Sequence, residues 1–388
     1  MKILYIHQYF RIPAEGGAIR SYYLAKGLIS QNFDVELITS HNKERYEVKI
    51  IEGIKVHYLP VPYLNEMGYI RRTIAFIKFF LWATIKAFKI QNADICYATS
   101  TPLTVGCISL ILKKWKRIPY IFEVRDLWPE APIQLGVIKN KIIKHLLTWL
   151  ELKIYGEAKA IVALSPGIKK HIEKISNTAI YCIPNMADTE LFKNSVNIDD
   201  PINDKDFVIT YFGAVGRVNR VQSLLQIAKE ARNYDHRIKF KIIGDGYAFS
   251  SIKNFISVDK LDNVEIHSSR NKEELQEILK TTDATYISYL DIPVLESSSP
   301  NKFFDSLASG KLLILNIKGW LLELVEENSC GIYVNPNLPD EFHSKILPFV
   351  QDKNLLKEYQ SNSLKLGKEL FSKEEQVKKL VNIFNTLK

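Results

Sequence analysis

The stretch LESSSPNKFFDSLASGKLLIL, residues 295–315, places a short helical pattern between a serine run and an all-apolar strand. Apolar strands that alternate with helices are typical of parallel sheets covered on both faces. The start of such a helix carries unpaired N–H groups and a partial positive charge, which attract anions. The stretch therefore predicts an α/β fold and a phosphate-type site at a helix start.

The same alternation extends through both halves of the chain. In the first half we expect helices at 17–30, 69–91, 102–115 and 139–156, between apolar runs such as KILYIHQYF, ADICYATS and PYIFEVRDL. The second half restarts the pattern with FVITYFGAVG, IKFKIIGDG and ATYISYL. The polar stretch KNSVNIDDPINDKD separates the halves and is the expected domain boundary. We predict two Rossmann-like parallel-sheet domains, residues 1–192 and 205–371, facing each other across a cleft where ligands bind.

Glycines at strand ends mark the expected ligand contacts. Gly16 and Gly17 follow the first strand and let the backbone approach a ligand, although a tight turn without a ligand explains them equally well. They do not form the Gly-x-Gly-x-x-Gly dinucleotide pattern. In the second half, glycines recur at corresponding strand ends beside arginines that can bind phosphate, which favours a nucleotide site. These residues are Gly213, Gly216, Arg217, Arg220, Gly244 and Gly246.

The opening stretch completes this donor site. Pro300 suits a first helical turn, and we expect Ser298 and Ser299 to cap the helix, with Asn301 and Lys302 beside the phosphate. One turn further on, Asp305 can accept hydrogen bonds from a ribose diol. The alternative is a capped surface helix in which Asp305 and Lys302 form a weak ion pair.

Three residues at strand ends of the first half are candidate catalytic groups. Arg125 and Asp126 end the strand in FEVRDLWPEAP and should face the cleft, although an Arg-Asp dipeptide is often a salt-bridged turn. His7 ends the first strand and is either a base or a structural histidine.

The net charge of +9 is concentrated in the first half, where residues 60–160 carry 15 Lys and Arg against 7 Asp and Glu. Such an excess indicates an anionic partner for one domain, but no nucleic-acid motif accompanies it. Four scattered cysteines favour neither disulfides nor a zinc site. The N-terminus resembles a strand rather than a signal peptide, so a cytoplasmic location is expected.

With these motifs in place, the chain resembles the retaining glycosyltransferases of family 4, which have the GT-B fold. The resemblance covers nearly the whole length, and it is greatest to the branch that builds bacterial capsule, O-antigen and related surface polysaccharides. It rests on the order of the motifs GGA (16–18), VRDLWPE (124–130), IPNMADTELF (183–192), GAVGR, IIGDG, SPNKFFDSLASGK and FSKEEQVKKLVNIF.

The resemblance implies that the second domain binds a nucleotide-sugar, often a UDP-sugar, and the first an acceptor, here a lipid-linked saccharide. It implies hexosyl or N-acetylhexosaminyl transfer with retention of configuration, commonly without a metal and with no other cofactor. The helix at 372–388 would pack back onto the first domain. Asp305 matches the family glutamate that holds the ribose, Arg217 the arginine at the diphosphate, and Gly16 and Gly17 the loop near it.

The chain departs from the family pattern in three places. Ser297 stands where the first family glutamate is expected, and Glu296 lies one residue away. The lysine that usually follows the diphosphate arginine is replaced, with Asn219 or Arg220 nearby, and Arg125 stands where many members have a histidine. A nucleotide-sugar epimerase on the same scaffold and a non-catalytic nucleotide-sugar-binding subunit are therefore kept as alternatives.

The segment YIRRTIAFIKFFLWATIKAFKI, residues 69–90, indicates a basic amphipathic helix on an anionic membrane. Its lysines argue against a span, and LKKWKR and IKNKIIKHLLTWLELKIY add cations to the same domain. We expect peripheral binding to the inner face of the cell membrane, the alternative being an ordinary domain helix. The cations that fall within an arc of roughly 80° at 100° per residue are Arg71, Lys78, Lys86 and Lys89.

Overall fold

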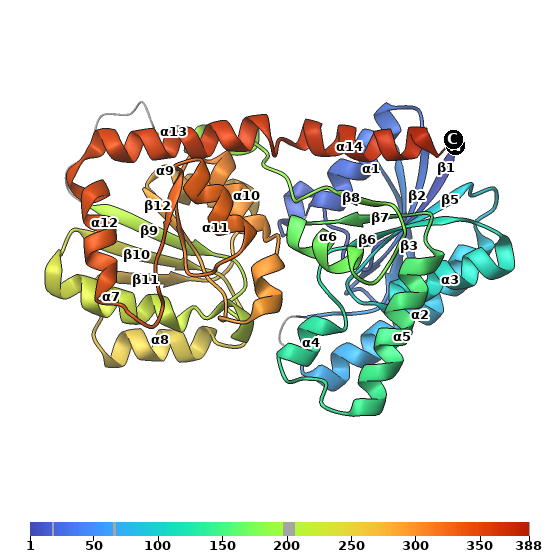
Figure 1. Ribbon diagram of the computed structural model, residues 1–388, viewed down its shortest axis with the longest axis horizontal. Coiled ribbons are helices and arrows are strands. Elements are labelled where there is room, and N and C mark those ends of the chain that lie inside the picture. The colour runs from blue at the N-terminus through green and yellow to red at the C-terminus, as the bar shows by residue number, and fades with distance from the viewer. Residues whose placement is uncertain (18, 65–66, 197–205, 388) are drawn as a thin grey trace.

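The computed structural model describes residues 1–17, 19–64, 67–196 and 206–387. They form two α/β domains that lie side by side, each built on one sheet with helices on both faces (Figure 1). The strand order is β3-β4-β2-β1-β5-β6-β7-β8 in the first sheet and β11-β10-β9-β12-β13-β14 in the second. The prediction of two Rossmann-like parallel-sheet domains is confirmed.

In the first sheet every neighbouring pair is parallel except β3 and β4, which are antiparallel. The edge strand β3 was not expected from the sequence, because its residues alternate only weakly and are mostly exposed. The strands are β1 (Lys2–Ile6), β2 (Asp34–His41), β3 (Glu47–Ile51), β4 (Ile54–Pro60), β5 (Ile95–Thr99), β6 (Tyr120–Val124), β7 (Ala160–Ala163) and β8 (Ile180–Cys182).

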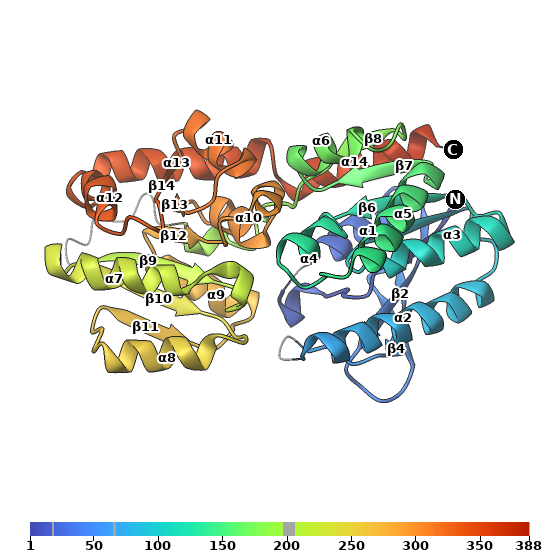
Figure 2. The same ribbon diagram turned by 60° about the horizontal axis from the view of Figure 1, so that its bottom comes forward.

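The helices of the first domain lie close to the predicted ranges. Helices α2, α3 and α5 cover one face of the sheet, and α1 covers the other face (Figure 2). The elements are η1 (Pro13–Glu15), α1 (Arg20–Ser30), α2 (Tyr69–Lys89), α3 (Thr104–Lys116), α4 (Glu130–Gln134), α5 (Lys141–Glu157), α6 (Pro166–Glu173) and η2 (Lys193–Ser195).

The second sheet is parallel throughout. Its strands are β9 (Phe207–Phe212), β10 (Ile238–Ile243), β11 (Val264–His267), β12 (Ala284–Ile287), β13 (Leu312–Leu315) and β14 (Gly331–Tyr333). The remaining elements are η3 (Arg217–Asn219), α7 (Gln222–Tyr234), α8 (Phe249–Val258), α9 (Lys272–Lys280), η4 (Pro293–Ser297), α10 (Asn301–Ala308), α11 (Trp320–Glu327), α12 (Glu341–Gln351), α13 (Lys353–Glu369) and α14 (Lys373–Thr386).

The chain crosses between the domains twice, and the two crossings touch. The N–H of Ala187 on the first crossing donates to the carbonyl of Phe371 on the second at 2.7 Å. Beyond the second crossing, α14 lies along α1 of the first domain, in line with α13 (Figure 1). Gly27 of α1 permits this contact, because a Cβ there would lie 2.1 Å from Val377 Cγ1. The C-terminal helix thus holds the domains together.

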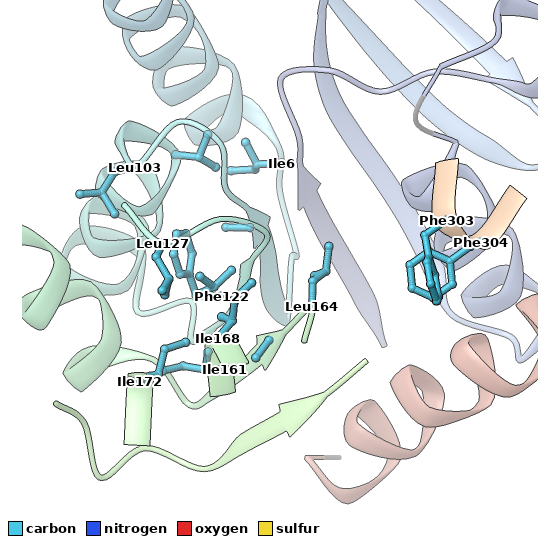
Figure 3. Close-up of a cluster of buried hydrophobic side chains, with 14 of the residues drawn as sticks. Ile6, Leu103, Phe122, Leu127, Ile161, Leu164, Ile168, Ile172, Phe303 and Phe304 are labelled. Atoms are coloured by element: carbon cyan, nitrogen blue, oxygen red, sulfur yellow. The ribbon is translucent and has the colours of Figure 1, made fainter. Parts of the chain in front are cut away.

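One apolar core runs through both domains. Leu164 and Ile168 of the first domain and Phe303 and Phe304 of α10 belong to the same buried cluster (Figure 3). Burial of apolar surface stabilises by about 25 cal/mol per Å², so this cluster favours the arrangement in which the domains touch. Among the described residues, no helix is long and apolar enough to cross a membrane.

Candidate functional site

The carboxyl ends of the parallel strands of both domains meet at the domain boundary. Ser165 Oγ donates to the carbonyl of Ser297 at 2.5 Å, and the N–H of Val294 donates to Gln134 Oε1 at 3.0 Å. The loop at Gly16 also reaches the second domain, because a Cβ there would lie 3.5 Å from Asn271 Cα. Loops after the strands of a parallel sheet are the usual ligand-binding positions, so this boundary is the candidate site.

His7 lies at the end of β1 in a buried chain of hydrogen bonds. Arg125 Nη1 donates to His7 Nε2 at 3.1 Å, and His7 Nδ1 is hydrogen-bonded to Ser21 Oγ at 2.8 Å. Burial, followed by the positive charges of Arg125 and Arg20, lowers the pKa of His7 well below its usual value. The imidazole is therefore neutral, with its proton on Nδ1, and its structural effect is to orient Arg125.

Asp126 is exposed at the beginning of the loop that follows β6, where Thr101 Oγ1 donates to its Oδ2 at 3.1 Å. Its charge reaches the second domain, because Asp126 helps burial to raise the pKa of Tyr289, the hydroxyl that follows β12. The Arg125-Asp126 pair does not form a salt-bridged turn: the arginine faces His7 and the carboxylate faces the domain boundary.

Lys302 is the buried cation of the second domain. Its Nζ donates to the Tyr211 hydroxyl at 2.9 Å and to Asn219 Oδ1 at 3.2 Å, and it lies 4.2 Å from the centre of the Tyr211 ring. Tyr289 contributes a second ring, 5.5 Å away. Burial lowers the pKa of Lys302 to about 7. Within the described part of the chain no carboxylate forms an ion pair with this lysine, so its charge is stabilised only by neutral groups.

The glycines of the second domain make room around this lysine. Gly213 has φ +123° and leaves space for Lys302, whose Cε would lie 3.5 Å from a Cβ. Gly244 packs on Gly213 so closely that a Cβ would lie 1.8 Å from the Gly213 carbonyl oxygen. Gly216 begins η3 beside Asn219, and Gly246 lies against Val215. The loops after β9 and β10 thus converge beside Lys302.

Asp305 is buried and forms an ion pair with Lys272 at the start of α9. Burial raises the pKa of Asp305, the charge of Lys272 opposes this, and nearby Asp188 adds to it. The carboxylate does not pair with Lys302, as the surface-helix alternative required. Lys272 was not among the predicted site residues.

The start of α10 differs from the prediction in its capping. Pro300 is the N-cap, and no side chain caps the helix, so the expected serine caps are wrong. Ser299 instead binds the first crossing: the N–H of Asn185 donates to Ser299 Oγ at 3.3 Å, and Asn185 Nδ2 donates to the Ser299 carbonyl at 2.5 Å. The Ser298 carbonyl accepts from Trp320 Nε1 at 2.8 Å. A proline before the helix leaves no residue with a side-chain oxygen at the cap position, and Asn301 is the first helical residue.

Only one of the two arginines after β9 has a hydrogen-bond partner among the described residues. Arg217 is exposed and makes no hydrogen bond or ion pair with a described residue. Arg220 Nη2 donates to Asn337 Oδ1 at 2.7 Å, beyond the end of β14. The second loop glycine of the first domain, Gly17, has φ +78° and no atom within 4 Å of a Cβ position, so its side faces open space.

Ser297 and Glu296 lie at and beside the position where the first family glutamate is expected. Neither forms a hydrogen bond or an ion pair with Lys302 in the described structure. Ser297 lies against the first domain, since a Cβ on Gly167 would be 2.8 Å from Ser297 Cβ, and its Oγ donates to the Val294 carbonyl. Glu296 lies against Gly319. The residues that sequence reasoning missed are Lys272, Tyr211 and Tyr289; only Tyr211 and Tyr289, at strand ends, carried a positional signal.

Two family models match this chain, Glycosyltransferase Family 4 over residues 14–191 and Glycosyl transferases group 1 over residues 194–366. The uncharacterized glycosyltransferase MJ1178 of Methanocaldococcus jannaschii is 24% identical, covering 100% of this chain and 99% of that protein. Among solved structures, sucrose-phosphate synthase from Thermosynechococcus elongatus superposes with a TM-score of 0.79 at 14% identity, covering 100% of this chain and 98% of that one.

The Anabaena protein HepE, solved with UDP and glucose and also with UDP-glucose, has a TM-score of 0.69 at 14% identity, with both chains fully covered. The two family models follow one another along the chain, and each covers one of the two parallel-sheet domains described above. The chain belongs to the family 4 and group 1 glycosyltransferases and has their GT-B fold.

Proposed function

We propose that this glycosyltransferase moves a hexosyl or N-acetylhexosaminyl group from a UDP-sugar to a lipid-linked saccharide, with retention of configuration, in bacterial surface-polysaccharide synthesis. The observation that carries the donor assignment is Lys302, a buried cation without an anionic partner in the described structure. A buried charge is costly unless it is paired. A diphosphate would supply the missing negative charge, which supports a donor site on the second domain and leaves the first for the acceptor.

The chemistry follows from the groups around this point. The bond between the sugar C1 and the diphosphate oxygen breaks, and its electron pair leaves with the diphosphate. The acceptor hydroxyl forms the new bond to C1 on the same face, and its proton passes to a phosphate oxygen. Lys302 and Arg217 stabilise the charge that develops on the phosphate. Asp126 faces the same boundary and can hold a hydroxyl of the acceptor or of the sugar in position.

The uridine assignment is supported by the Anabaena structure, whose nucleotide-sugar is UDP-glucose. Asp305 supplies a carboxylate for the ribose, beside the Gly16 loop that reaches Asn271. We test the donor by the thermal midpoint of the protein with different nucleotide-sugars, because a ligand that binds only the folded state raises it. A UDP-sugar should give the largest shift; equal shifts with all nucleotides would contradict the assignment.

Turnover separates the transferase from its alternatives. Incubation of the UDP-sugar with the protein alone should release little UDP, and a lipid-linked saccharide should accelerate the release. A donor converted to its epimer without acceptor would support the epimerase alternative instead. Binding without any turnover would support the non-catalytic subunit.

The outer helices of the first domain support a membrane-bound acceptor. Helix α2 turns Ala75, Phe79, Ala83 and Ala87 toward the core, whereas most of its other large apolar residues face outward. Among the described side chains of α2 and α5, the exposed apolar ones are Ile70, Ile74, Ile77, Leu81, Trp82, Ile85, Phe88, Ile142, Ile143, Leu146, Trp149 and Leu152. We call these residues the outer apolar face. A helix that only covers a sheet buries its large apolar residues, so this face requires a partner.

Cations lie on and beside the outer apolar face. Lys78 Nζ lies 5.4 Å from the Trp82 ring centre, and on the neighbouring helix α3 Lys114 Nζ lies 5.7 Å from the ring centre of Trp115. Each Lys or Arg near an anionic leaflet contributes about 1 kcal/mol, and indole rings favour the interface between lipid and water. We propose that this face lies on the anionic inner surface of the cell membrane.

The membrane proposal is tested by sedimentation with vesicles. Vesicles containing phosphatidylserine or phosphatidylglycerol should retain the protein at low salt and release part of it at high salt, whereas neutral vesicles should retain less. The double variant Ile74→Asn and Leu81→Asn should stay in the supernatant. Ile50→Asn, at a still more exposed isoleucine that lies on β3 outside this face, is the control. Equal sedimentation of the wild type under every condition would refute the proposal.

A further inference from the structure

Lys272 occupies a position that is unfavourable for a lysine in two respects. It is the first residue of α9, where the helix dipole repels a cation. Its side chain is only 7% exposed, so its charge has lost most of its hydration. The cap of the helix is already supplied by Asn271, whose Oδ1 accepts from the N–H of Glu274 at 2.8 Å. Neither helix formation nor capping requires a lysine here.

The charge of Lys272 is directed at Asp305. Its Nζ donates to Asp305 Oδ2, and it also lies 5.4 Å from the ring centre of Phe192, on the first crossing. The second carboxylate oxygen, Oδ1, makes no hydrogen bond with any residue in the described structure, yet it is not among the fully buried unpaired atoms. One oxygen of Asp305 is therefore held, and the other remains accessible to a ligand.

No other charged group in the described structure takes the place of Lys272 beside Asp305. Asp188 adds a negative charge, although it is itself held by Lys373 at 2.7 Å and by the hydroxyl of Tyr23. Lys302, one turn away on α10, is bonded to Tyr211 and Asn219 instead. Lys272 is thus the cation that directly compensates the buried Asp305.

We propose that Lys272 is a positioning residue for nucleotide binding, which keeps Asp305 ionised and fixes its carboxylate so that Oδ1 accepts from the ribose diol. The inference rests on the proposed function, because it concerns the same donor. A carboxylate is an acceptor at both oxygens, whereas a protonated carboxyl carries a donor in place of one acceptor. Without Lys272, burial and Asp188 would raise the pKa of Asp305 further and favour its protonated form.

The direction in which nucleotide binding should depend on pH follows from the loss of the Lys272 charge. In Lys272→Met the pKa of Asp305 rises, so ribose binding weakens as the pH falls through that raised value and recovers as the pH increases. In the wild type the charge of Lys272 opposes that rise, so this acid limb lies at lower pH. A purely structural role of Lys272 would lower affinity by the same factor at every pH.

The experiment measures the Kd of UDP-glucose by calorimetry between about pH 6 and about pH 8.5, a range in which its diphosphate diester does not titrate and free Asp is ionised. We expect the ratio of Kd for Lys272→Met over wild type to exceed about 10 at the acid end and to fall severalfold toward the basic end. Taking the ratio removes the titration of Lys302, which both proteins share.

Three controls keep the outcomes distinct. Lys272→Arg keeps the charge and should give a pH profile like that of the wild type, and Lys280→Met removes an exposed lysine of the same helix. The thermal midpoint without ligand reports folding. A constant Kd ratio in folded Lys272→Met would overturn the role of Lys272. Failure of the wild type to bind either UDP-glucose or free UDP at any pH would instead contradict the proposed UDP-linked donor.

Discussion

The two domains present different kinds of charge to the boundary between them. On the first domain, Asp126 is exposed and Arg125 is held by a neutral histidine. On the second, Lys302 and Asp305 are buried before any ligand arrives. Buried charges gain most from a ligand of opposite sign or from a matching donor, because they are already dehydrated. Under the proposed function, the second domain gives up folding stability to bind the donor, while the hydrated carboxylate of the first can act on the acceptor.

The largest effect should come from Lys302→Met. Removal of the buried cation should lower turnover by about a thousandfold, as for other groups that stabilise developing charge. The thermal midpoint should stay equal or rise, because a buried unpaired charge opposes folding. Steady-state kinetics and thermal melts measure both quantities. Normal UDP affinity in this variant would place the phosphate site elsewhere.

Asp126→Asn should distinguish the role of the first domain from that of the second. The amide keeps the size of the side chain but loses the charge, so turnover should fall about a hundredfold if the carboxylate positions a reacting hydroxyl. The Kd of UDP should stay unchanged, because Asp126 lies on the opposite domain. A parallel loss of UDP affinity would contradict the proposal that the second domain binds the donor and the first acts on the acceptor.

Asp305→Ala should weaken binding of the nucleotide-sugar by about ten- to a hundredfold, the worth of a charge-assisted hydrogen bond. The variant also leaves Lys272 buried without a partner, so its thermal midpoint should fall. Double variants with Lys272→Met should regain part of that stability without regaining affinity. Unchanged affinity in the folded single variant would contradict the ribose assignment.

Most of the fold and part of this site can be predicted from the sequence. Apolar runs such as LLIL at β13 and AIVA at β7 predict buried parallel strands because every residue in them is apolar. The Lys272–Asp305 pair was not predictable, because its members lie 33 residues apart on different helices and Lys272 sits in an ordinary charged helix, KEELQEILK. The prediction that serines cap α10 was wrong because Pro300 occupies the N-cap position. The presence of hydroxyl residues near a helix start does not reveal which residue takes that position.

The pH dependence of donor binding should follow Lys302. Its pKa of about 7 in the unliganded protein means that the ammonium is lost above neutrality. Since the diphosphate binds the protonated form, Kd should rise about tenfold per pH unit above that value. The unliganded protein should instead become more stable over this range, because its unfolded chain still binds the proton. Lys302→Met should lack both trends.

The smallest effect should come from Arg217→Gln, which tests whether exposure sets the size of these effects. Arg217 has the charge and the position for a phosphate contact, but its guanidinium is hydrated and has no partner in the described structure. An exposed ion pair contributes about 0.2–1 kcal/mol, so UDP affinity should fall only about two- to fivefold. Salt should remove most of that difference, because exposed charges are screened. Titrations of wild type and variant at low and high salt measure it. A loss as large as that of Lys302→Met, persisting at high salt, would mean that Arg217 becomes buried when the donor binds, and that the contrast between the two domains describes only the unliganded protein.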